Sequence, residues 1–291
     1  MKSRPTHQLN ATSPRIIGIL NVTPDSFSDG GNFLDIKVAV DAAIAMFLDG
    51  ADIVDIGGES TRPGALSVSP EEQLERVLPV IEALKSDSRF PSTGLISVDT
   101  CCAQVAETAI AHGAGMVNDI TAGTGDPNMF TLVAQSGIPV VLMHMQGTPE
   151  TMQIHPVYQD VVAEVRDYLC DRTQAALEAG IPHENIVIDP GICFGKRREH
   201  NLELLANLNA FVNLGFPVLL GCSRKRFMGA ICREQEPREL VGATVATTAL
   251  AVIQGVRMFR VHDVKANRQA ADVAMAIASC NPELGSRRAS I

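Results

Sequence analysis

The chain has 291 residues, of which 46% are hydrophobic, so it is long enough for one large domain with a substantial core. Its 33 acidic and 24 basic residues give a formal net charge of -9, which disfavours non-specific binding to nucleic acid or to anionic membranes. Tryptophan is absent and only two tyrosines occur, so there are few aromatic side chains on which single-stranded nucleic acid could stack.

The cysteine pattern and the N-terminal sequence indicate the compartment. Seven cysteines occur without the paired spacing of a disulfide framework, which favours a reducing environment. The first apolar run, 16–20, is too short for a signal peptide. No stretch approaches the roughly 18 apolar residues of a membrane span. We therefore expect a cytoplasmic protein.

Short apolar runs recur along the chain, each followed by a turn signal and then by a helical pattern. Continuous apolar runs, rather than alternating ones, are typical of parallel strands that are covered on both faces. The eight runs are 16–20, 53–56, 95–98, 115–117, 139–143, 186–188, 217–220 and 258–261. They predict eight parallel strands.

The stretches between these runs have the spacing of helices. Ser69 followed by Pro70 predicts a helix with a serine cap and proline at its first position. Further helical patterns cover 35–49, 158–179, 199–213, 237–254 and 264–279. Glycines stand where helix C-caps belong, at Gly50, Gly113, Gly137, Gly180, Gly215 and Gly255.

Strand and helix thus alternate eight times, which predicts an α/β fold, a single (β/α)8 TIM barrel. We expect the barrel to cover residues 15–280, with tails at 1–14 and 281–291. The stretches 21–31 and 57–64, after the first two strands, are too long and too rich in glycine for tight turns. They are similar to mobile loops that cover a substrate. A doubly wound sheet is the alternative fold.

Every predicted strand ends in residues that are able to do chemistry. In such barrels the carboxyl ends of all the strands converge on one mouth, where active sites are built. The residues at these ends are Asn21, Asp55, Asp99, Asn118, Asp119, His144, Asp189, Ser223, Lys225, Arg260 and His262. One such residue is more often a local cap or turn, but eight strand ends in succession favour a site.

The chemistry of these side chains indicates the kind of ligand that the site binds. Lys225, Arg260 and His262 follow the last two strands, where barrels commonly bind phosphates. Asp99 and Asp189 can accept hydrogen bonds from ring N–H and amino groups, and the amide of Asn118 can both donate and accept. The array suits a flat heterocycle, rich in N–H groups, that carries a phosphate. Signatures of zinc, P-loop and dinucleotide sites are missing from the sequence.

Four segments carry a resemblance to a known family. They are 21–31 (NVTPDSFSDGG), 57–64 (GGESTRPG), 189–196 (DPGICFGK) and 221–229 (GCSRKRFMG), the last together with 260–263 (RVHD). In combination they resemble the dihydropteroate synthases, a family of pterin-binding TIM barrels. The resemblance extends from about residue 16 to about residue 278.

The resemblance implies a transferase of folate biosynthesis. It would condense 6-hydroxymethyl-7,8-dihydropterin diphosphate with p-aminobenzoate, giving 7,8-dihydropteroate and pyrophosphate. It also implies Mg²⁺ as cofactor, a homodimer, and membership of a family that is a sulfonamide target.

The resemblance further assigns roles to single residues. Those implied to hold the pterin are Asp99, Asn118, Asp189, Lys225, Met143 and Phe194. Thr61, Arg260 and His262 would bind the diphosphate, and Asn21 would bind the metal. The p-aminobenzoate pocket would consist of Phe27, Ser60, Arg62, Pro63 and Ser223.

Two positions depart from the family pattern, and three other functions remain open at this point. Arg226 stands where relatives often have a small hydroxyl residue, and Arg197 where threonine is frequent. The alternatives are a pterin-binding methyltransferase domain, a Schiff-base aldolase that uses Lys225, and a homologue that binds pterin without catalysis.

Overall fold

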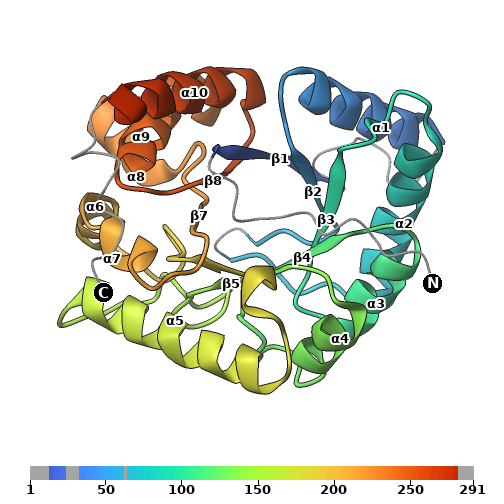
Figure 1. Ribbon diagram of the computed structural model, residues 1–291, viewed down its shortest axis with the longest axis horizontal. Helices are drawn as coiled ribbons and strands as arrows, with labels where there is room; N and C mark the ends of the chain where they lie inside the picture. The colour runs from blue at the N-terminus through green and yellow to red at the C-terminus, as the bar shows by residue number, and fades with distance from the viewer. Residues whose placement is uncertain (1–12, 24–32, 62–63, 281–291) are drawn as a thin grey trace.

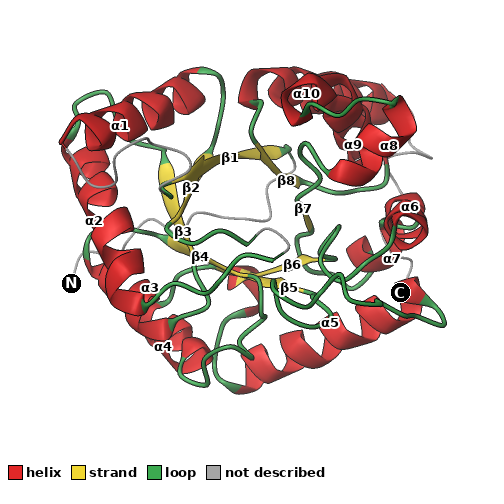
Figure 2. Ribbon diagram, turned by 180° about the vertical axis from the view of Figure 1, so that it is seen from behind, coloured by secondary structure: helices red, strands yellow, loops and turns green. Residues whose placement is uncertain are grey.

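Eight parallel strands form a barrel surrounded by helices (Figures 1 and 2). The computed structural model describes residues 13–23, 33–61 and 64–280. The strand order is β6-β5-β4-β3-β2-β1-β8-β7, and a bridge between Ile188 and Val218 joins β6 to β7 and closes the barrel. The predicted TIM barrel is therefore confirmed. Most of the two predicted tails lies outside the described residues, so the domain limits stay a prediction.

The strands are short and nearly all of their residues are buried. They are β1 (Arg15–Asn21), β2 (Ile53–Gly57), β3 (Leu95–Asp99), β4 (Met116–Asp119), β5 (Val140–Met143), β6 (Ile186–Asp189), β7 (Leu219–Leu220) and β8 (Met258–Val261). Each overlaps its predicted run. The predicted run 217–220 becomes a strand of two residues, although the carbonyl of Pro217 still accepts from Ile188 N–H.

Ten α-helices and two 3-10 helices lie in the described part of the chain. They are α1 (Phe33–Leu48), α2 (Pro70–Ser86), α3 (Ala103–Ala111), α4 (Met129–Ser136), α5 (Val161–Glu178), η1 (His183–Asn185), α6 (Arg198–Ala206), α7 (Asn209–Val212), α8 (Arg226–Cys232), η2 (Pro237–Leu240), α9 (Val241–Ile253) and α10 (Val264–Cys280). None of them is long and apolar enough to cross a membrane.

The local signals at helix ends are confirmed with two corrections. Ser69 caps α2 by accepting from the N–H of Glu72, and all six predicted C-cap glycines have positive φ. The single helix expected over 199–213 is wrong, because the chain breaks at Asn207 into α6 and α7. The helix expected over 237–254 begins instead as the 3-10 turn η2.

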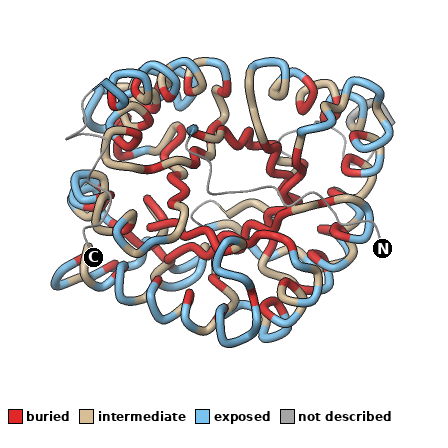
Figure 3. The backbone as a smooth tube through the Cα atoms, in the orientation of Figure 1, coloured by how far each residue is buried: buried red, intermediate tan, exposed pale blue. Residues whose placement is uncertain are grey.

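Side chains from all eight strands fill the amino-terminal end of the barrel and form an apolar plug. Each strand contributes one apolar residue near its amino end, and together they form a separate core cluster of Ile17, Ile53, Leu95, Met116, Val141, Val187, Leu219 and Met258. A larger apolar core fills the space between strands and helices, and Figure 3 shows the buried strands inside a ring of helices with exposed outer faces. The barrel is therefore closed by side chains at its amino end.

Candidate active site

The layer above the apolar plug is polar. Successive strand residues point to opposite faces, so the residues two positions beyond the plug point inward as well. That next layer consists of Ile19, Asp55, Ser97, Asn118, Met143, Asp189, Gly221 and Arg260. Four of its eight members carry a carboxylate, an amide or a guanidinium. Within two residues along each strand, the inward-facing side chains thus change from an apolar layer that closes the barrel to a layer that can bind a polar ligand.

An arginine shared by two carboxylates occupies one side of this layer. Arg260 on β8 donates from Nε to Asp55 Oδ2 at 2.6 Å and from Nη2 to Asp99 Oδ2 at 2.7 Å. Asn118 on β4 donates from Nδ2 to the same oxygen of Asp55 at 3.2 Å. The amide oxygen of Asn118 is thereby turned away from Asp55. The cluster holds four polar side chains from four strands in one arrangement.

Burial dominates the electrostatics of this cluster. Burial raises the pKa of Asp99 to about 7, although the charge of Arg260 opposes the shift. For Arg260 itself, burial opposes the charge, but the attraction of Asp55 and Asp99 outweighs it and raises the pKa. The remaining oxygen of Asp55, Oδ1, and the hydroxyl of Ser97 are buried and have no hydrogen-bond partner within the described residues. A buried polar atom without a partner is costly, so these two atoms mark where a polar ligand or water would be stabilised.

Asp189 faces this cluster from the end of β6. Its Oδ1 accepts from the N–H of Gly191 at 2.7 Å. Burial raises its pKa to about 6, against the opposing effects of that hydrogen bond and of the Lys225 charge. The other oxygen, Oδ2, lies 3.6 Å from where a Cβ on Gly221 would stand, so the missing side chain at 221 leaves room in front of the carboxylate. A planar ring can therefore approach Asp189 from the barrel axis.

Basic and hydroxyl side chains lie at the ends of β7 and β8. The Ser223 hydroxyl accepts from the backbone N–H of His262 at 3.1 Å and lies 2.9 Å from His262 Nδ1. Burial, together with Arg224 and Arg260, lowers the pKa of His262 to about 3, so this histidine is neutral at physiological pH. Lys225 lies with its Nζ 4.7 Å from the centroid of the Phe194 ring. The cationic charge here therefore resides on lysine and arginine rather than on histidine.

The structure brings together most of the residues predicted for the site. Gly57 lies beneath Asn21 and Asp99, because a Cβ on it would be 3.7 Å from Asn21 Oδ1 and 3.6 Å from Asp99 Oδ2. Ser60 and Thr61 follow in the same loop and are half-buried. Three residues assigned to the p-aminobenzoate pocket lie outside the described residues, namely Phe27, Arg62 and Pro63.

Other predicted positions have structural explanations. Arg226 is exposed at the start of α8, and Arg197 is exposed and stands at the N-cap of α6. Asp263, at the start of α10, directs its carboxylate to Arg224, from which it accepts two hydrogen bonds of 2.9 and 2.6 Å. None of these three belongs to the inward-facing layer.

Two features of the site were not predicted from sequence. Asp55 was recognised at a strand end but not assigned to the site, although its place two residues after the plug residue Ile53 would have located it. Lys196 and His144 form a buried pair behind Asp189, with Lys196 Nζ 2.8 Å from His144 Nδ1. No periodicity signals that pair, because Lys196 lies in a turn.

A divalent metal would depend on oxygen donors from the substrate. Among the residues that the structure describes, no group of three or more His, Cys, Asp or Glu side chains is placed to hold a metal ion. Asn21 offers an amide oxygen at the mouth, which is a hard ligand of the type that Mg²⁺ accepts. Mg²⁺ commonly takes one or two protein ligands and completes its shell with phosphate oxygens and waters. The donor set therefore fits Mg²⁺ when a diphosphate is present.

Comparisons with known proteins agree with this geometry. Residues 17–262 match the family model described as pterin binding enzyme. The chain is 45% identical over 262 residues to a dihydropteroate synthase of Synechocystis sp., covering 90% of this chain and 89% of that protein.

Solved structures give the same result. A Xanthomonas albilineans dihydropteroate synthase with 4-aminobenzoic acid superimposes with a TM-score of 0.84 at 45% identity, covering 93% of this chain and 94% of the other. A structure from the same organism in complex with 7,8-dihydropteroate gives a TM-score of 0.81 at 42% identity, covering 93% and 95%. The chain therefore belongs to the pterin-binding enzyme family and, within it, to the dihydropteroate synthases, transferases that condense a dihydropterin diphosphate with p-aminobenzoate.

Proposed function

We propose that the polar layer above the plug binds the pterin ring. The observation that carries this proposal is the set of inward-facing polar groups, two residues beyond the plug on separate strands. Asp189 would accept from the ring N–H and amino groups, and Asn118 would pair with a ring edge that both donates and accepts. Met143 would cover one face of the ring, and Phe194 with Lys225 would lie near its edge.

The diphosphate would point toward the ends of β7 and β8. His262 is neutral, so it would serve as a hydrogen-bond donor, and Lys225 and Arg260 would supply positive charge. Thr61 would add a hydroxyl donor from the β2 loop. Because Arg260 also binds Asp55 and Asp99, its guanidinium would stay fixed while the charge on the leaving group develops.

The reaction is a substitution at the methylene carbon of the pterin. The amino nitrogen of p-aminobenzoate forms a bond to this carbon as the bond from carbon to the diphosphate oxygen breaks, and the nitrogen then loses a proton to solvent. Asp99 and Asp55 would lie beside the ring and would favour positive charge that develops on it. No base is required to activate the aniline, because its nitrogen is neutral and carries a lone pair near pH 7.

Asn21 would hold Mg²⁺ together with the diphosphate oxygens. The ion would supply charge neutralisation for the departing pyrophosphate. For p-aminobenzoate, we assign the mouth between the β2 loop and Ser223, with Ser60 on the loop side. Phe27, Arg62 and Pro63 complete this assignment as predictions from the family resemblance.

The division between ring-binding and diphosphate-binding residues can be tested by calorimetry with two ligands. These are the pterin diphosphate with Mg²⁺ and the plain hydroxymethyl pterin. Asp189→Asn should weaken both, by about 1–3 kcal/mol, because an amide presents a donor to ring donors. His262→Ala should weaken only the diphosphate form. Equal losses of both ligands in His262→Ala would contradict the assignment.

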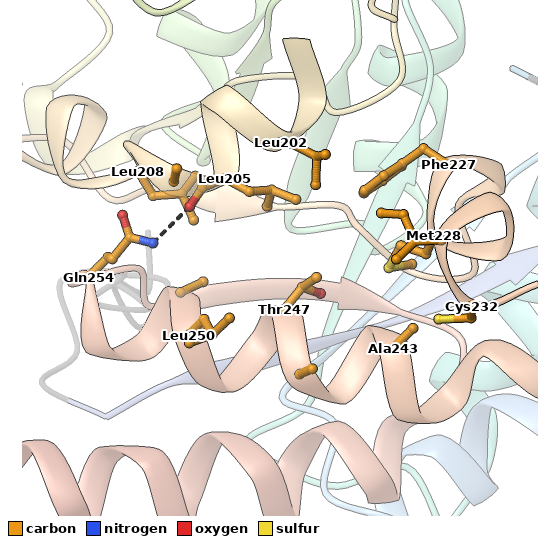
Figure 4. Close-up of a pocket in the computed structure, with 14 residues that line it drawn as sticks. Leu202, Leu205, Leu208, Phe227, Met228, Cys232, Ala243, Thr247, Leu250 and Gln254 are labelled. Carbon is orange, nitrogen blue, oxygen red and sulfur yellow. Dashed lines mark hydrogen bonds between the residues drawn. The ribbon is translucent and has the colours of Figure 1, made fainter. Parts of the chain in front are cut away.

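We also propose that the protein is a homodimer, with its interface at an apolar groove on the outside of the barrel. The groove has a volume of about 620 Å³ and lies between α6, α8 and α9 (Figure 4). Leu202, Ile231 and Leu250 on its walls are 43%, 52% and 65% exposed. At one end Gln254 donates to the carbonyl of Leu205 at 2.8 Å, which leaves the remaining wall almost entirely apolar. Exposed apolar surface of this kind is typical of subunit interfaces.

The cytoplasm is the compartment that we propose for this protein. All seven cysteines are free thiols. A reducing compartment keeps thiols in this state.

A further inference from the structure

Lys196 is a buried lysine behind the pterin-binding layer. It is 2% exposed. Its Nζ has hydrogen bonds to carbonyl oxygens and a ring nitrogen, and the charge of Asp189 acts on it from farther away and opposes the effect of burial on its pKa. Nζ donates to the carbonyl oxygens of Gly191 at 2.9 Å and Phe194 at 3.0 Å, and it lies 2.8 Å from His144 Nδ1. The carbonyl oxygen of His144 lies farther from Nζ, at 3.4 Å. An ammonium group has three N–H donors, so these acceptors satisfy it completely.

His144 provides the fixed side of this arrangement. Its backbone N–H donates to the carbonyl of Asp189 at 3.0 Å, which extends the pairing of β5 with β6 by one residue. Burial lowers the pKa of its ring to about 3, so the ring is neutral. Nδ1 therefore accepts from Lys196, which leaves the ring proton on Nε2. The ring packs edge-on against Tyr168, with centroids 4.8 Å apart.

Lys196 binds the backbone of the turn 190–196, through the carbonyls of Gly191 and Phe194. This turn supplies the Gly191 N–H that binds Asp189 Oδ1, and it carries the Phe194 ring that lies under Lys225. Gly191 adopts a φ of +67°, and a Cβ on it would stand 1.9 Å from the carbonyl oxygen of His144. The turn thus packs directly against the end of β5. Lys196 joins the two because it hydrogen-bonds both to the turn and to His144, which follows β5.

Stability alone does not account for a lysine at this position. Burial lowers the pKa of Lys196 to about 7, which shows that its charge is disfavoured there. Replacing buried charged groups by apolar residues of similar shape is often neutral or stabilising. What an apolar side chain lacks is the ability to bind three acceptors from two segments at once.

We propose that Lys196 is a positioning residue for pterin binding, which joins the Gly191–Phe194 turn to His144 and thereby fixes the directions of Asp189 and Phe194. This inference rests on the proposed function, in which Asp189 and Phe194 contact the ring. Lys196 itself is buried and would touch neither the ring nor the diphosphate. Its effect is transmitted through Asp189.

The test compares Lys196→Met with Lys265→Met, an exposed lysine on α10. Calorimetry measures the affinity for hydroxymethyl pterin well below the melting temperature of each variant. Lys196→Met should weaken pterin by about tenfold or more, because a misplaced binding group costs that much or more. Lys265→Met should bind as the unaltered protein does. At saturating pterin diphosphate, the KM for p-aminobenzoate should stay within about twofold of the unaltered value.

A double-mutant cycle separates positioning from general stabilisation. If Lys196 acts through Asp189, Lys196→Met added to Asp189→Asn should cost less than about twofold more in pterin affinity. Fully additive losses, or a pterin affinity unchanged in Lys196→Met, would overturn the inference. Should Lys196→Met fail to fold, His144→Phe serves instead, since it keeps an aromatic ring against Tyr168 and removes both ring nitrogens, including the Nδ1 acceptor for Lys196. It should also weaken pterin, and full affinity in that variant would refute the proposal. Failure of the unaltered protein to bind pterin would refute the proposed function.

Discussion

Asp189 illustrates how burial sets the chemistry of a single binding group. Burial raises its pKa to about 6, so the folded protein protonates it more readily than an unfolded chain does. This raised pKa stabilises the fold most below the unfolded pKa of 3.8, and the contribution is lost as the pH rises through 6. Ligand binding has the opposite dependence, because ring N–H donors require the ionised carboxylate.

The first prediction concerns the pH dependence of pterin binding. Pterin affinity should be constant above about pH 7 and should fall below pH 6, approaching tenfold per pH unit because one proton must leave. Calorimetry between pH 5.5 and 8 measures the profile. In Asp189→Asn the profile should be clearly shallower over this range, since position 189 no longer titrates and only Asp99 and Lys196, whose burial shifts each pKa to about 7, still do. An equally steep profile in that variant would assign the pH dependence to another residue.

The second prediction concerns Arg260, which binds two buried carboxylates. Arg260→Met leaves Asp55 and Asp99 without their cation, and breaking a buried ion pair in this way costs about 3–5 kcal/mol. Urea unfolding at pH 8 measures the loss. The loss of unfolding free energy in Arg260→Met should be smaller at pH 5. Burial already raises the pKa of Asp99 to about 7, so Asp99 is protonated at pH 5 and one of the two unpaired charges is removed.

The control for Arg260 is an exposed arginine. The side chain of Arg198, on α6, is 53% exposed, and among the described residues it pairs with its neighbour Glu199 at 3.4 Å. Arg198→Met should change the free energy of unfolding by less than about 1 kcal/mol. Comparable losses of unfolding free energy in both variants would show that the ion pairs of Arg260 with Asp55 and Asp99 are not what stabilises the mouth of the barrel.

At the scale of elements, the strands were predictable and their contacts were not. Continuous apolar runs located all eight strands, because parallel strands covered on both faces need apolar side chains along their length. The partners of Arg260 lie 205 and 161 residues away in the chain, so no local pattern indicates them. The role of Asp55 was missed for the same reason. The break between α6 and α7 was missed because Asn207 ends a helix without a glycine or proline signal.

The third prediction uses two glycines with nearly the same φ angle. Gly137 has a φ of +66° and nothing within 4 Å of the place where a Cβ would stand, whereas Gly191 has a φ of +67° and its Cβ would meet the His144 carbonyl at 1.9 Å. Gly137→Ala should cost only the conformational strain, about 1–2 kcal/mol. Gly191→Ala should cost more and should also weaken pterin binding, because the turn that orients Asp189 must move.

Chemical unfolding and pterin calorimetry on both glycine variants decide the point. Pterin affinity retained in Gly191→Ala would show that the turn tolerates displacement. That result would remove the link between the packing of this element and the site.

At the scale of the molecule, the barrel separates two surfaces with different tasks. The carboxyl end carries the polar mouth, while exposed apolar side chains gather on the outer helices α6, α8 and α9 and continue onto α10 with Val273 and Ile277, which are 60% and 56% exposed. In Figure 1 α8, α9 and α10 lie side by side. A second copy of the chain would cover this apolar surface without closing the mouth.

The fourth prediction tests this surface. Leu250→Glu should convert a dimer into monomers, because burying an unpaired carboxylate in an apolar interface costs several kcal/mol. Leu48→Glu on α1, where the leucine is 84% exposed and distant from the groove, should leave the dimer intact. Sedimentation velocity over a range of concentrations measures both. A monomeric unaltered protein, or a dimeric Leu250→Glu, would contradict the assignment of the interface.

The central claim is that the polar mouth of this barrel joins a dihydropterin diphosphate to p-aminobenzoate. The most direct test is to measure pyrophosphate release and dihydropteroate formation together, with Mg²⁺ present, in the unaltered protein and in Asp189→Asn. We expect release that requires p-aminobenzoate, matches dihydropteroate in a ratio of one to one, and falls by about tenfold or more in the variant at subsaturating pterin diphosphate. Release at the same rate without p-aminobenzoate, or full activity in Asp189→Asn, would contradict the account.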